Sequence, residues 1–537
     1  MEIANLIYVN GKVLTVDNDN RVVSALAVKN NLILAVGSNE EVLVYQDENT
    51  KVIDLMGKTM IPGFCDAHGH FSMAAESLIK ANLANPPVGK NTCISDYINA
   101  LKEKARTVPV GQWIYGYGYD NTSIQEMRHP TRAELDQVST EHPIWITHVS
   151  SHMGVANSKA LEICGITQDT PTPEGGVIGK DSEGELNGFL EETAMFLIGS
   201  LSIDLPEEER LELLAKASDL YAQVGVTSAS DGLVESFELI ENYKKSVLNK
   251  DLKIRVVMNP SYELIETNPE LSFESDKLTL GGVKSFADGS IQGYTAYLSK
   301  PYYKPGNNAD NYNGYPWMSY DELLEKVKNI HNANQQCVIH GNGDAAIGDI
   351  IRAYRTAQEE NPRDDCRHVI VHCQTASEEQ LDEIKSLNII PSFFALHTYY
   401  WGDRHRDIFL GPDRAFRIDP CKSALDRDIP FNIHCDTPVV PQNPLLSMYA
   451  AVNRISSNGN VIGKEQRISP LDALKAVTIN SAYQNFEEKT KGSLEVGKFA
   501  DLVILDENPL ECNPEKIKDI NVLETIVGGE TVYTSLV

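Results

Sequence analysis

The 537-residue sequence has few positive charges relative to its acidic residues, and its cysteines do not form a closely spaced pairing motif. Lysine and arginine number 47 against 76 acidic residues, and the net charge of −29 repels nucleic acid and anionic membranes. The nine cysteines are scattered and include no Cys-x-x-Cys pair, which indicates a reducing compartment and argues against a disulfide framework. We therefore expect a cytoplasmic protein that acts on a small molecule and does not bind nucleic acid.

Several signals of location and of cofactor use are also missing. No apolar run reaches 18 residues, and the N-terminus lacks a basic segment followed by a long apolar core, so we expect neither a membrane span nor the usual export signal. There is no Gly-x-Ser-x-Gly, no phosphate loop ending in Gly-Lys-Ser/Thr and no dinucleotide fingerprint. These absences argue against a serine hydrolase or a nucleotide enzyme, and they predict no nucleotide cofactor.

What the sequence does contain is a set of metal-binding residue types at the ends of apolar runs. Residues 61–70 read as a buried strand that ends in His68 and His70, and alternate strand residues face the same side. A lone His-x-His is often only a polar strand rim. Three further short apolar runs, however, each end in a possible ligand where a loop begins: His340, His372 and Asp436. Together these residues predict a metal site.

Ligands spread over more than 360 residues converge only if their strands are parallel neighbours. A (β/α)8 barrel provides this arrangement, because its chemistry gathers at the carboxyl ends of the strands. We therefore predict an α/β fold built on a TIM barrel. Besides the strand ending at His68, the expected barrel strands are 226–230, 254–258, 282–287, 336–340, 368–372, 389–394 and 430–435.

The two ends of the chain differ from the middle. Residues 1–58 and 488–537 contain short alternating strands with Asn-Gly-type turns, and we expect them to pair into one small β-sandwich domain. Residues 59–487 would form the barrel domain. Within it, residues from 71 to about 220 read as a large α+β insertion after the first strand that could cover the site. Its helix-like stretches are 92–106, 131–138, 158–164 and 206–224.

The chain resembles the amidohydrolase superfamily, and within it the amidohydrolase-3 branch of N-substituted formamide deformylases and YtcJ-like and AepA-like metal-dependent hydrolases. The resemblance covers nearly the whole chain, because its motifs occur in the family's order. These motifs are Pro62 to His70, His129 to Asp136, Asn157 to Leu161, Lys284 to Ser290, His340 to Asp344, His372, Asp436 to Pro438 and Gly492 to Val503.

The resemblance implies a site with two divalent ions. His68 and His70 would hold one ion and His340 and His372 the second, while Asp436 would bind metal and accept a proton. Imidazole and carboxylate ligands suit zinc, with iron or manganese as alternatives.

Lys284 matches the lysine that related enzymes carbamylate to bridge their two metals. Carbamylation turns a cationic side chain, which has no lone pair to offer, into an anionic oxygen ligand. The alternative is an ordinary ammonium group paired with Asp288, which would leave a single-metal site.

Five residues are candidates for substrate binding, each with a plainer alternative. His152 lies at a family position on the insertion, but an exposed loop histidine commonly has no role. Aromatic and histidine side chains could line an apolar pocket under the insertion or serve only in packing. Glu191 and Glu192 read as helix-capping or solvated residues, and His368 and His434 as hydrogen-bonded core residues. The candidates are His152, Tyr117, Asp288, His397 and Trp401.

The predicted function is hydrolysis of an amide-type C–N bond other than a peptide bond, with an N-formyl or N-acyl amine or a cyclic amide as substrate. The alternative is a regulatory or binding protein on the same scaffold, since a fold does not fix a function. A homodimer is expected by analogy with enzymes of this type.

Overall fold

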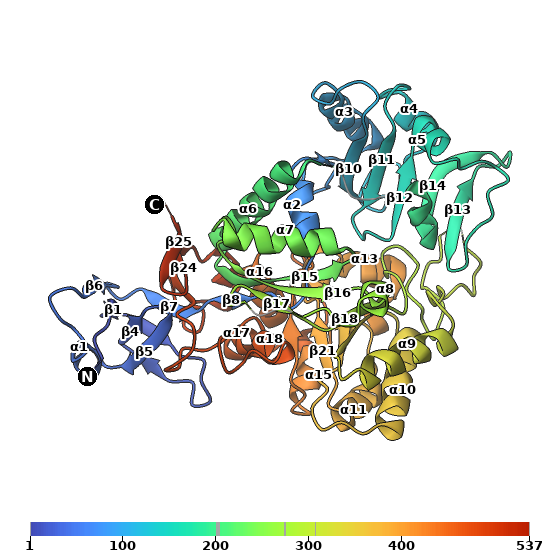
Figure 1. The fold of residues 1–537 in the computed structure, drawn as a ribbon. Coiled ribbons are helices and arrows are strands. Elements are labelled where there is room, and N and C mark those ends of the chain that lie inside the picture. The colour runs from blue at the N-terminus through green and yellow to red at the C-terminus, as the bar shows by residue number, and fades with distance from the viewer. Residues whose placement is uncertain (1, 200–204, 273–274, 307, 536–537) are drawn as a thin grey trace.

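The computed structural model describes residues 2–199, 205–272, 275–306 and 308–535. Two parallel sheets lie at its centre (Figure 1). The first has the order β17-β16-β15-β8, with β8 (Phe64–Cys65), β15 (Val226–Val234), β16 (Arg255–Pro260) and β17 (Leu278–Leu280). The second has the order β18-β19-β20-β21-β22, with β18 (Val283–Phe286), β19 (Cys337–Gly341), β20 (Val369–His372), β21 (Ile390–Phe393) and β22 (Asn432–Ile433).

The two parallel sheets are linked on both sides. A parallel bridge between Ser261 and Lys284 joins the end of β16 to β18. At the other edge, the Asp436 N–H after β22 donates to the carbonyl oxygen of His68 at 3.1 Å, and the His70 N–H donates to that of Thr437 at 2.7 Å. All seven strands predicted after residue 220 are present, and β17 is an additional one.

Helices alternate with these strands, as an α/β fold requires. Several of them begin at a side-chain cap; Ser319, for example, accepts a hydrogen bond from the N–H of Glu322 at the start of its helix. They are α2 (Phe71–Ser77), α6 (Glu207–Gln223), α7 (Phe237–Leu248), α8 (Tyr262–Thr267), α9 (Tyr320–Asn332), α10 (Asp344–Glu360), α11 (Glu378–Ser386), α12 (Leu396–Tyr400), α13 (Gly402–Arg404), α15 (Cys421–Leu425), α16 (Pro444–Asn453), α17 (Pro470–Ala476) and α18 (Ile479–Gln484). Among the residues described, no helix is both long and apolar enough to cross a membrane.

The first predicted strand is divided between two sheets. Residues of β7 (Thr59–Pro62) pair with β2 and β23, and β8 then pairs with β15. Gly63 lies between them, where a Cβ would meet Thr227 Oγ1 at 2.1 Å. The run predicted as one strand is therefore two strands that change partners at Gly63, and the second ends at Cys65 rather than at His68.

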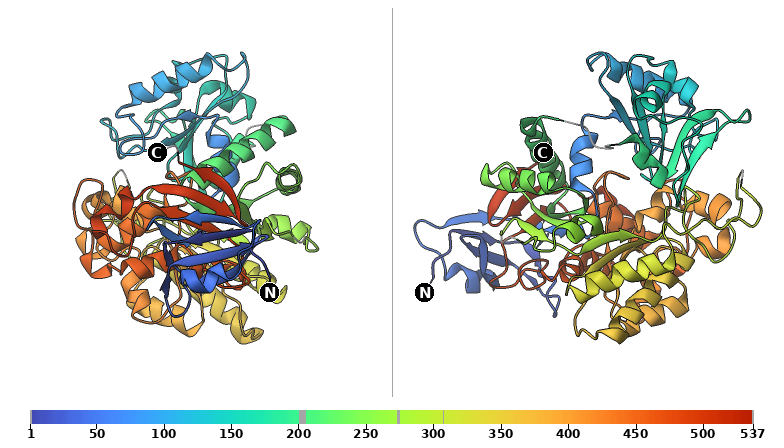
Figure 2. Two further views of the ribbon diagram at one scale, coloured as in Figure 1. Left: turned by 90° about the vertical axis from the view of Figure 1, so that its left-hand side faces the viewer. Right: turned by 45° about the vertical axis from the view of Figure 1, so that its right-hand side comes forward.

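The two ends of the chain pair with each other (Figure 2, left). One sheet has the order β25-β24-β23-β7-β2-β3 and the other β5-β4-β1-β6. Residues from both ends share one apolar core, including Tyr8, Leu26, Leu502 and Ile526. The strands are β1 (Leu6–Val9), β2 (Lys12–Leu14), β3 (Val22–Val23), β4 (Ala25–Lys29), β5 (Leu32–Gly37), β6 (Lys51–Asp54), β23 (Leu502–Leu505), β24 (Val522–Val527) and β25 (Glu530–Thr534), with α1 (Asn39–Leu43) beside them.

A six-stranded sheet of order β13-β14-β12-β11-β10-β9 forms the insertion, which stands out at the top of Figure 1. Its strands are β9 (Ala81–Asn82), β10 (Ile114–Tyr119), β11 (Ile144–His148), β12 (Met153–Ala156), β13 (Gly176–Lys180) and β14 (Leu186–Glu192), with α3 (Ile94–Ala105), α4 (Arg132–Asp136) and α5 (Ser158–Ile163). All four helices predicted between 71 and 220 are present. The last, α6, packs on α2, α7 and β15, so the sheet-bearing part of the insertion ends before it.

Two family-like motifs prove to be structural. Thr131 and Glu134 form a capping box at the start of α4, and Arg128 pairs with Glu134 at 2.7 Å. The Asn157 side chain caps α5 and also accepts from the N–H of Ile144 at 2.9 Å. These motifs hold the helices of the insertion on its sheet.

Candidate metal centre

His68, His70 and Asp436 meet at the carboxyl ends of the first and last parallel strands. His68 Nε2 lies 3.6 Å and His70 Nε2 3.5 Å from Asp436 Oδ1. One ligand atom from each of the three lies within 4.8 Å of the others, a spacing that a single ion can bridge. His68 and His70, which the sequence predicts to hold one ion, therefore lie beside the predicted carboxylate of Asp436.

The surroundings of the Asp436 carboxylate favour a bound cation. Its Oδ1 is buried and has no well-formed hydrogen bond among the described residues. Burial alone would raise the pKa of Asp436, but the approach of His70 at 3.5 Å and the charges of His70, His434 and Lys284 outweigh burial and lower the pKa. An anionic oxygen without a good donor fits a metal ion, because a buried charge is costly unless it is paired.

His340 and His372 lie next to each other at the ends of β19 and β20. Their ring centroids are 4.7 Å apart, and the His372 ring is 5.9 Å from that of His68. Burial, followed by the charges of neighbouring groups, holds the pKa values of His68, His340 and His372 well below the ordinary histidine range. Neutral imidazole is the form that binds a divalent ion, so the donor set fits zinc or a similar metal.

Lys284 is 1% exposed on β18, with its Nζ 4.8 Å from the centre of the Phe286 ring. Burial lowers the pKa of Lys284 to about 7, although the charge of Asp436 opposes this. No ion pair joins Lys284 to Asp288 within the described part of the chain. Asp288 instead accepts backbone N–H bonds from Asn342, Gly343 and Tyr297 at 2.8–2.9 Å, so the pairing with Asp288 that the alternative for the lysine included is not found.

Asp288 was a candidate for substrate binding, and the structure gives it another set of contacts. It is fully buried, and its Oδ1 lies 3.4 Å from His340 Nδ1 as well as accepting the N–H of Asn342. The carboxylate thus lies behind a predicted ligand, where metal-binding histidines usually have a partner, although His340 Nδ1 makes no well-formed hydrogen bond among the described residues.

The insertion places His152 over this centre. The His152 ring centroid is 5.0 Å from that of His340, and its Nδ1 lies 2.9 Å from Glu192 Oε2. Burial alone would lower the pKa of His152, but the carboxylate of Glu192, aided by Asp288 and Asp436, raises it. The reading of Glu192 as a capping or solvated residue is wrong, since it is 4% exposed and makes no capping bond.

A cavity of about 380 Å³ lies between the insertion and the parallel sheets. Its lining is largely apolar and includes two of the predicted pocket residues, Tyr117 and Trp401, together with Thr437, which follows Asp436. His397 does not line it: this side chain is buried, with Nδ1 3.2 Å from Asp419 Oδ1 and its ring 5.9 Å from that of His372. Thr437 is therefore the link between the cavity and the centre, whose proposed ligands do not line it, and residues 82–88 and 117–123 of the insertion form part of its wall.

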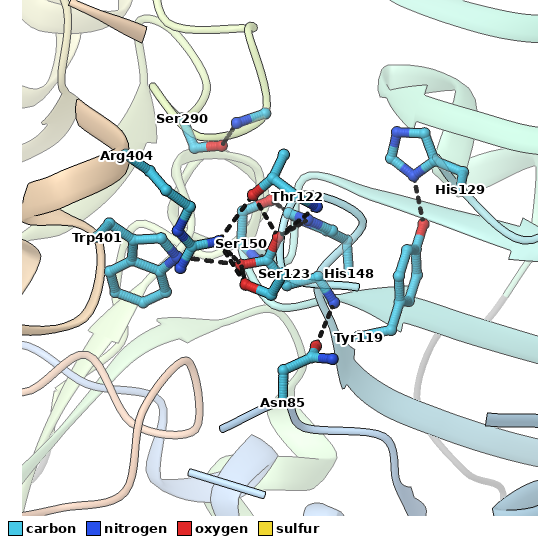
Figure 3. A network of polar contacts seen from close by, with 12 residues as sticks. Asn85, Tyr119, Thr122, Ser123, His129, His148, Ser150, Ser290, Trp401 and Arg404 are labelled. Atoms are coloured by element: carbon cyan, nitrogen blue, oxygen red, sulfur yellow. Dashed lines mark hydrogen bonds and ion pairs between the residues drawn. The ribbon is translucent and has the colours of Figure 1, made fainter. Parts of the chain in front are cut away.

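Asp120 joins the insertion to the parallel sheets at the wall of this cavity. Its Oδ2 accepts from Arg404 Nη1 at 2.5 Å and from Trp401 Nε1 at 3.3 Å. Figure 3 shows Arg404 and Trp401 reaching toward Thr122 and Ser123, whose hydroxyl groups lie 2.7 and 2.6 Å from Arg404 Nη1. We call this group, Asp120, Thr122, Ser123, Trp401 and Arg404, the clasp.

His434 is the site residue that the sequence reading missed. Its ring lies 5.2 Å from that of His68 and 5.1 Å from that of His372, and among the described residues neither ring nitrogen has a hydrogen-bond partner. The expectation of a hydrogen-bonded core histidine is therefore wrong here. The His-x-Asp spacing of His434 and Asp436, which repeats that of His68 and His70, could have revealed it.

A second group of metal-binding residue types, His331, Cys366 and His368, is satisfied without an ion. The Cys337 N–H donates to His368 Nδ1 at 3.0 Å, His368 Nε2 lies 2.9 Å from His331 Nδ1, and His331 Nε2 lies 2.7 Å from the carbonyl oxygen of Asn361. These three hydrogen bonds use both ring nitrogens of His331 and of His368, so the expected hydrogen-bonded role of His368 is confirmed.

The carboxyl ends of the parallel strands bring imidazoles together with a buried carboxylate oxygen that has no hydrogen-bond partner among the residues that the structure describes. This arrangement is typical of metal-dependent α/β enzymes. Comparison with known proteins makes this more specific. The family model described as "Amidohydrolase family" matches residues 51–533, and the chain belongs to that family. The resemblance drawn from the motifs is therefore confirmed.

Individual relatives agree with this placement. The chain is 28% identical to N-substituted formamide deformylase of Arthrobacter pascens, over 99% of both chains. It is 29% identical to Protein LONG AFTER FAR-RED 3 of Arabidopsis thaliana, over 99% of this chain and 92% of the relative. An uncharacterized metal-dependent hydrolase from Pyrococcus horikoshii has a similar structure, with a TM-score of 0.75 and 25% identity over 95% of this chain and 99% of that one.

Proposed function

We propose that this protein hydrolyses an amide-type C–N bond other than a peptide bond, in an N-formyl or N-acyl amine or a cyclic amide. The observation that carries the proposal is the position of Asp436 Oδ1, buried between the Nε2 atoms of His68 and His70 without a good hydrogen bond. The formamide-cleaving relative supports the bond type. The largely apolar cavity beside the centre suits an uncharged substrate group.

We assign His68, His70 and Asp436 to one metal ion and His340 and His372 to a second, with zinc as the preferred metal. A bound divalent ion would supply Lewis acidity, lowering the pKa of water to about 7 and polarising a carbonyl group. Lys284 would join the two ions after its neutral Nζ forms a C–N bond with carbon dioxide and releases a proton, leaving a carbamate.

Asp436 moves the proton in the proposed reaction. Its carboxylate takes the proton of the attacking water and later delivers it to the departing amine nitrogen, which is general base followed by general acid catalysis. The insertion covers the centre and limits the access of bulk water, while Tyr117 and Trp401 contact the apolar part of the substrate in the cavity.

The fold proposal completes this assignment. We propose that eight strands of the two parallel sheets, all except the additional strand β17, form one closed barrel, supported by the Ser261–Lys284 bridge and by the backbone bonds of His68 and Asp436. Residues 1–58 and 488–537 would be its accessory β-sandwich domain. A homodimer in the cytoplasm stays a prediction.

The test is elemental analysis of protein purified without chelator, together with hydrolysis of a panel of N-formyl and N-acyl amines. We expect two equivalents of zinc or a similar ion per chain, and activity that is lost with a chelator and restored with metal. Protein that binds no metal even after reconstitution would overturn the proposal in favour of a regulatory or binding role.

A further inference from the structure

The cavity between the insertion and the parallel sheets has exposed apolar residues as well as buried ones in its lining. Leu78, after α2, Val88, in the insertion, and Leu220, on α6, are 37–44% exposed, and all three line the cavity. Thr437, which follows Asp436 in the chain, also lines it but is buried. The cavity therefore connects an apolar mouth at the surface with a buried end next to the centre.

The polar groups in the wall of the cavity are already paired. Among the described residues, the charged ones in the lining are Asp120 and Arg404, and they form an ion pair with each other. The Asn85 side chain accepts from the Tyr97 hydroxyl at 2.9 Å and donates to the carbonyl oxygen of Asn91 at 2.6 Å. Because burying a charge without a partner is costly, this wall suits an uncharged group.

Thr437 ties the buried end of the cavity to the centre. Its carbonyl oxygen accepts the N–H of His70 at 2.7 Å, and neighbouring Cα atoms are about 3.8 Å apart. A group that extends from the centre toward Thr437 therefore enters the cavity within a few bonds. In the proposed reaction Asp436 delivers a proton to the departing nitrogen, so the substituent on that nitrogen is the part of the substrate nearest to Thr437.

We propose that this cavity binds the substituent on the nitrogen of the amide that is cleaved, and that this substituent is an uncharged apolar chain long enough to pass Thr437. The inference deepens the proposed function and rests on it. It names the substrates as N-alkyl and N-arylalkyl amides, in preference to N-formyl and N-acyl amino acids. The carboxylate of an amino acid would enter a lining whose one described cation, Arg404, is already paired.

The first test measures kcat/KM of the metal-loaded protein for N-methyl, N-ethyl, N-butyl and N-hexyl formamide. We expect similar values for the two short substituents, which do not pass Thr437. From ethyl to hexyl, kcat/KM should rise about threefold or more for each methylene group, the gain from burying that group in an apolar site. Values that do not rise from ethyl to hexyl would overturn the inference.

The second test replaces the terminal methyl group of N-hexylformamide by a carboxylate, as in N-formyl-6-aminohexanoate. The wild type should prefer N-hexylformamide by about tenfold or more, since the carboxylate finds no free cation. Leu220→Lys adds a cation at the mouth of the cavity and should narrow this preference. Leu248→Lys is the matched control, because Leu248 is 80% exposed on α7, outside the described lining, and its variant should keep the wild-type preference.

Metal content is checked in every variant by elemental analysis. A wild type without preference between the two compounds, or an equal change in Leu220→Lys and Leu248→Lys, would contradict the proposed role of the cavity.

A third readout does not depend on turnover. Isothermal titration calorimetry of the metal-loaded protein compares N-hexyl with N-ethyl methanesulfonamide, whose S–N bond is not the bond of the proposed reaction. We expect the hexyl compound to bind about tenfold more tightly or better. Equal binding of the two compounds in a protein that hydrolyses formamides contradicts the role of the cavity alone. Tighter binding of the hexyl compound without hydrolysis of any formamide contradicts the proposed function.

Discussion

At the residue scale, the centre combines neutral imidazoles with one anionic carboxylate. Burial lowers the pKa values of His68, His340 and His372, so these rings keep their lone pairs at neutral pH. Asp436 is held in its ionised form by the imidazoles beside it, against the effect of its own burial. The same side chain is therefore available both as a ligand and as a proton acceptor.

Asp436→Asn separates these two roles. The amide keeps an oxygen that can still approach a metal, but it cannot accept a proton, so we expect kcat to fall about 100- to 10,000-fold while metal content persists. Single-turnover kinetics and elemental analysis on the same preparation check this. Wild-type turnover in the variant would remove Asp436 from the mechanism.

Lys284→Ala tests the carbamate. Without the bridging oxygen we expect activity to fall roughly 100-fold or more, since a group that holds a metal in place is lost. Added acetate or propionate should restore part of it by filling the vacated space with a carboxylate. Lys284→Arg, which cannot form the carbamate and fills that space, serves as the control. Equal responses of the two variants to acetate would contradict the bridge.

Single residues also show where the sequence was and was not sufficient. The five proposed ligands stand out in the sequence because each lies at or just after the end of an apolar run. Glu192 could not, since its burial depends on a positive φ and on Gly289, which lies almost a hundred residues further along the chain. His434 was assigned a hydrogen-bonded core position because the sequence does not show which nitrogens find partners.

At the element scale, the clasp couples the insertion to the rest of the fold. Burial alone would raise the pKa of Asp120, but Arg404, His148 and Thr122 outweigh it and lower the pKa. A lowered pKa means that the carboxylate stabilises the folded state above its ordinary titration range. This contribution is lost as the pH falls through the folded-state pKa.

Asp120→Asn should therefore destabilise the protein by about 3 kcal/mol near neutral pH, because it leaves the Arg404 charge without its partner. The difference from wild type should shrink below about pH 4, where Asp120 begins to lose its charge in the unfolded chain. Urea unfolding at pH 7 and at pH 3 measures both values. Asp169→Asn, at an exposed acid of the insertion, is the control and should match wild type at either pH.

The sequence predicts helices and strands correctly where a whole apolar run belongs to a single helix or to a single sheet. The later parallel strands and the four helices between 71 and 220 fall where the pattern places them. The run before His68 was predicted as one strand, because nothing in its apolar pattern reveals that β7 and β8 have different partners. The change of partner at Gly63 depends on Thr227, a contact distant in sequence.

At the scale of the whole molecule, the proposed centre ties the first parallel strand to the last. A metal ion that binds the folded chain and not the unfolded chain stabilises the folded state by mass action. Removing the metal should therefore lower the unfolding temperature by several degrees. Differential scanning calorimetry with and without chelator measures the shift, and added zinc should reverse it. The doubly altered His68→Ala, His70→Ala variant should show a much smaller shift, and an identical one would contradict the assignment.

The pairing of β7 with β23 has a consequence for biosynthesis. About 440 residues separate the two strands, so a ribosome working at about 5–20 residues per second needs roughly 20 to 90 s to pass from one to the other. Throughout that interval β7 lacks its partner β23, and for most of it His68 lacks Asp436. The nascent chain therefore depends on protection from aggregation until translation is nearly complete, and the proposed metal sites can be filled only after that point.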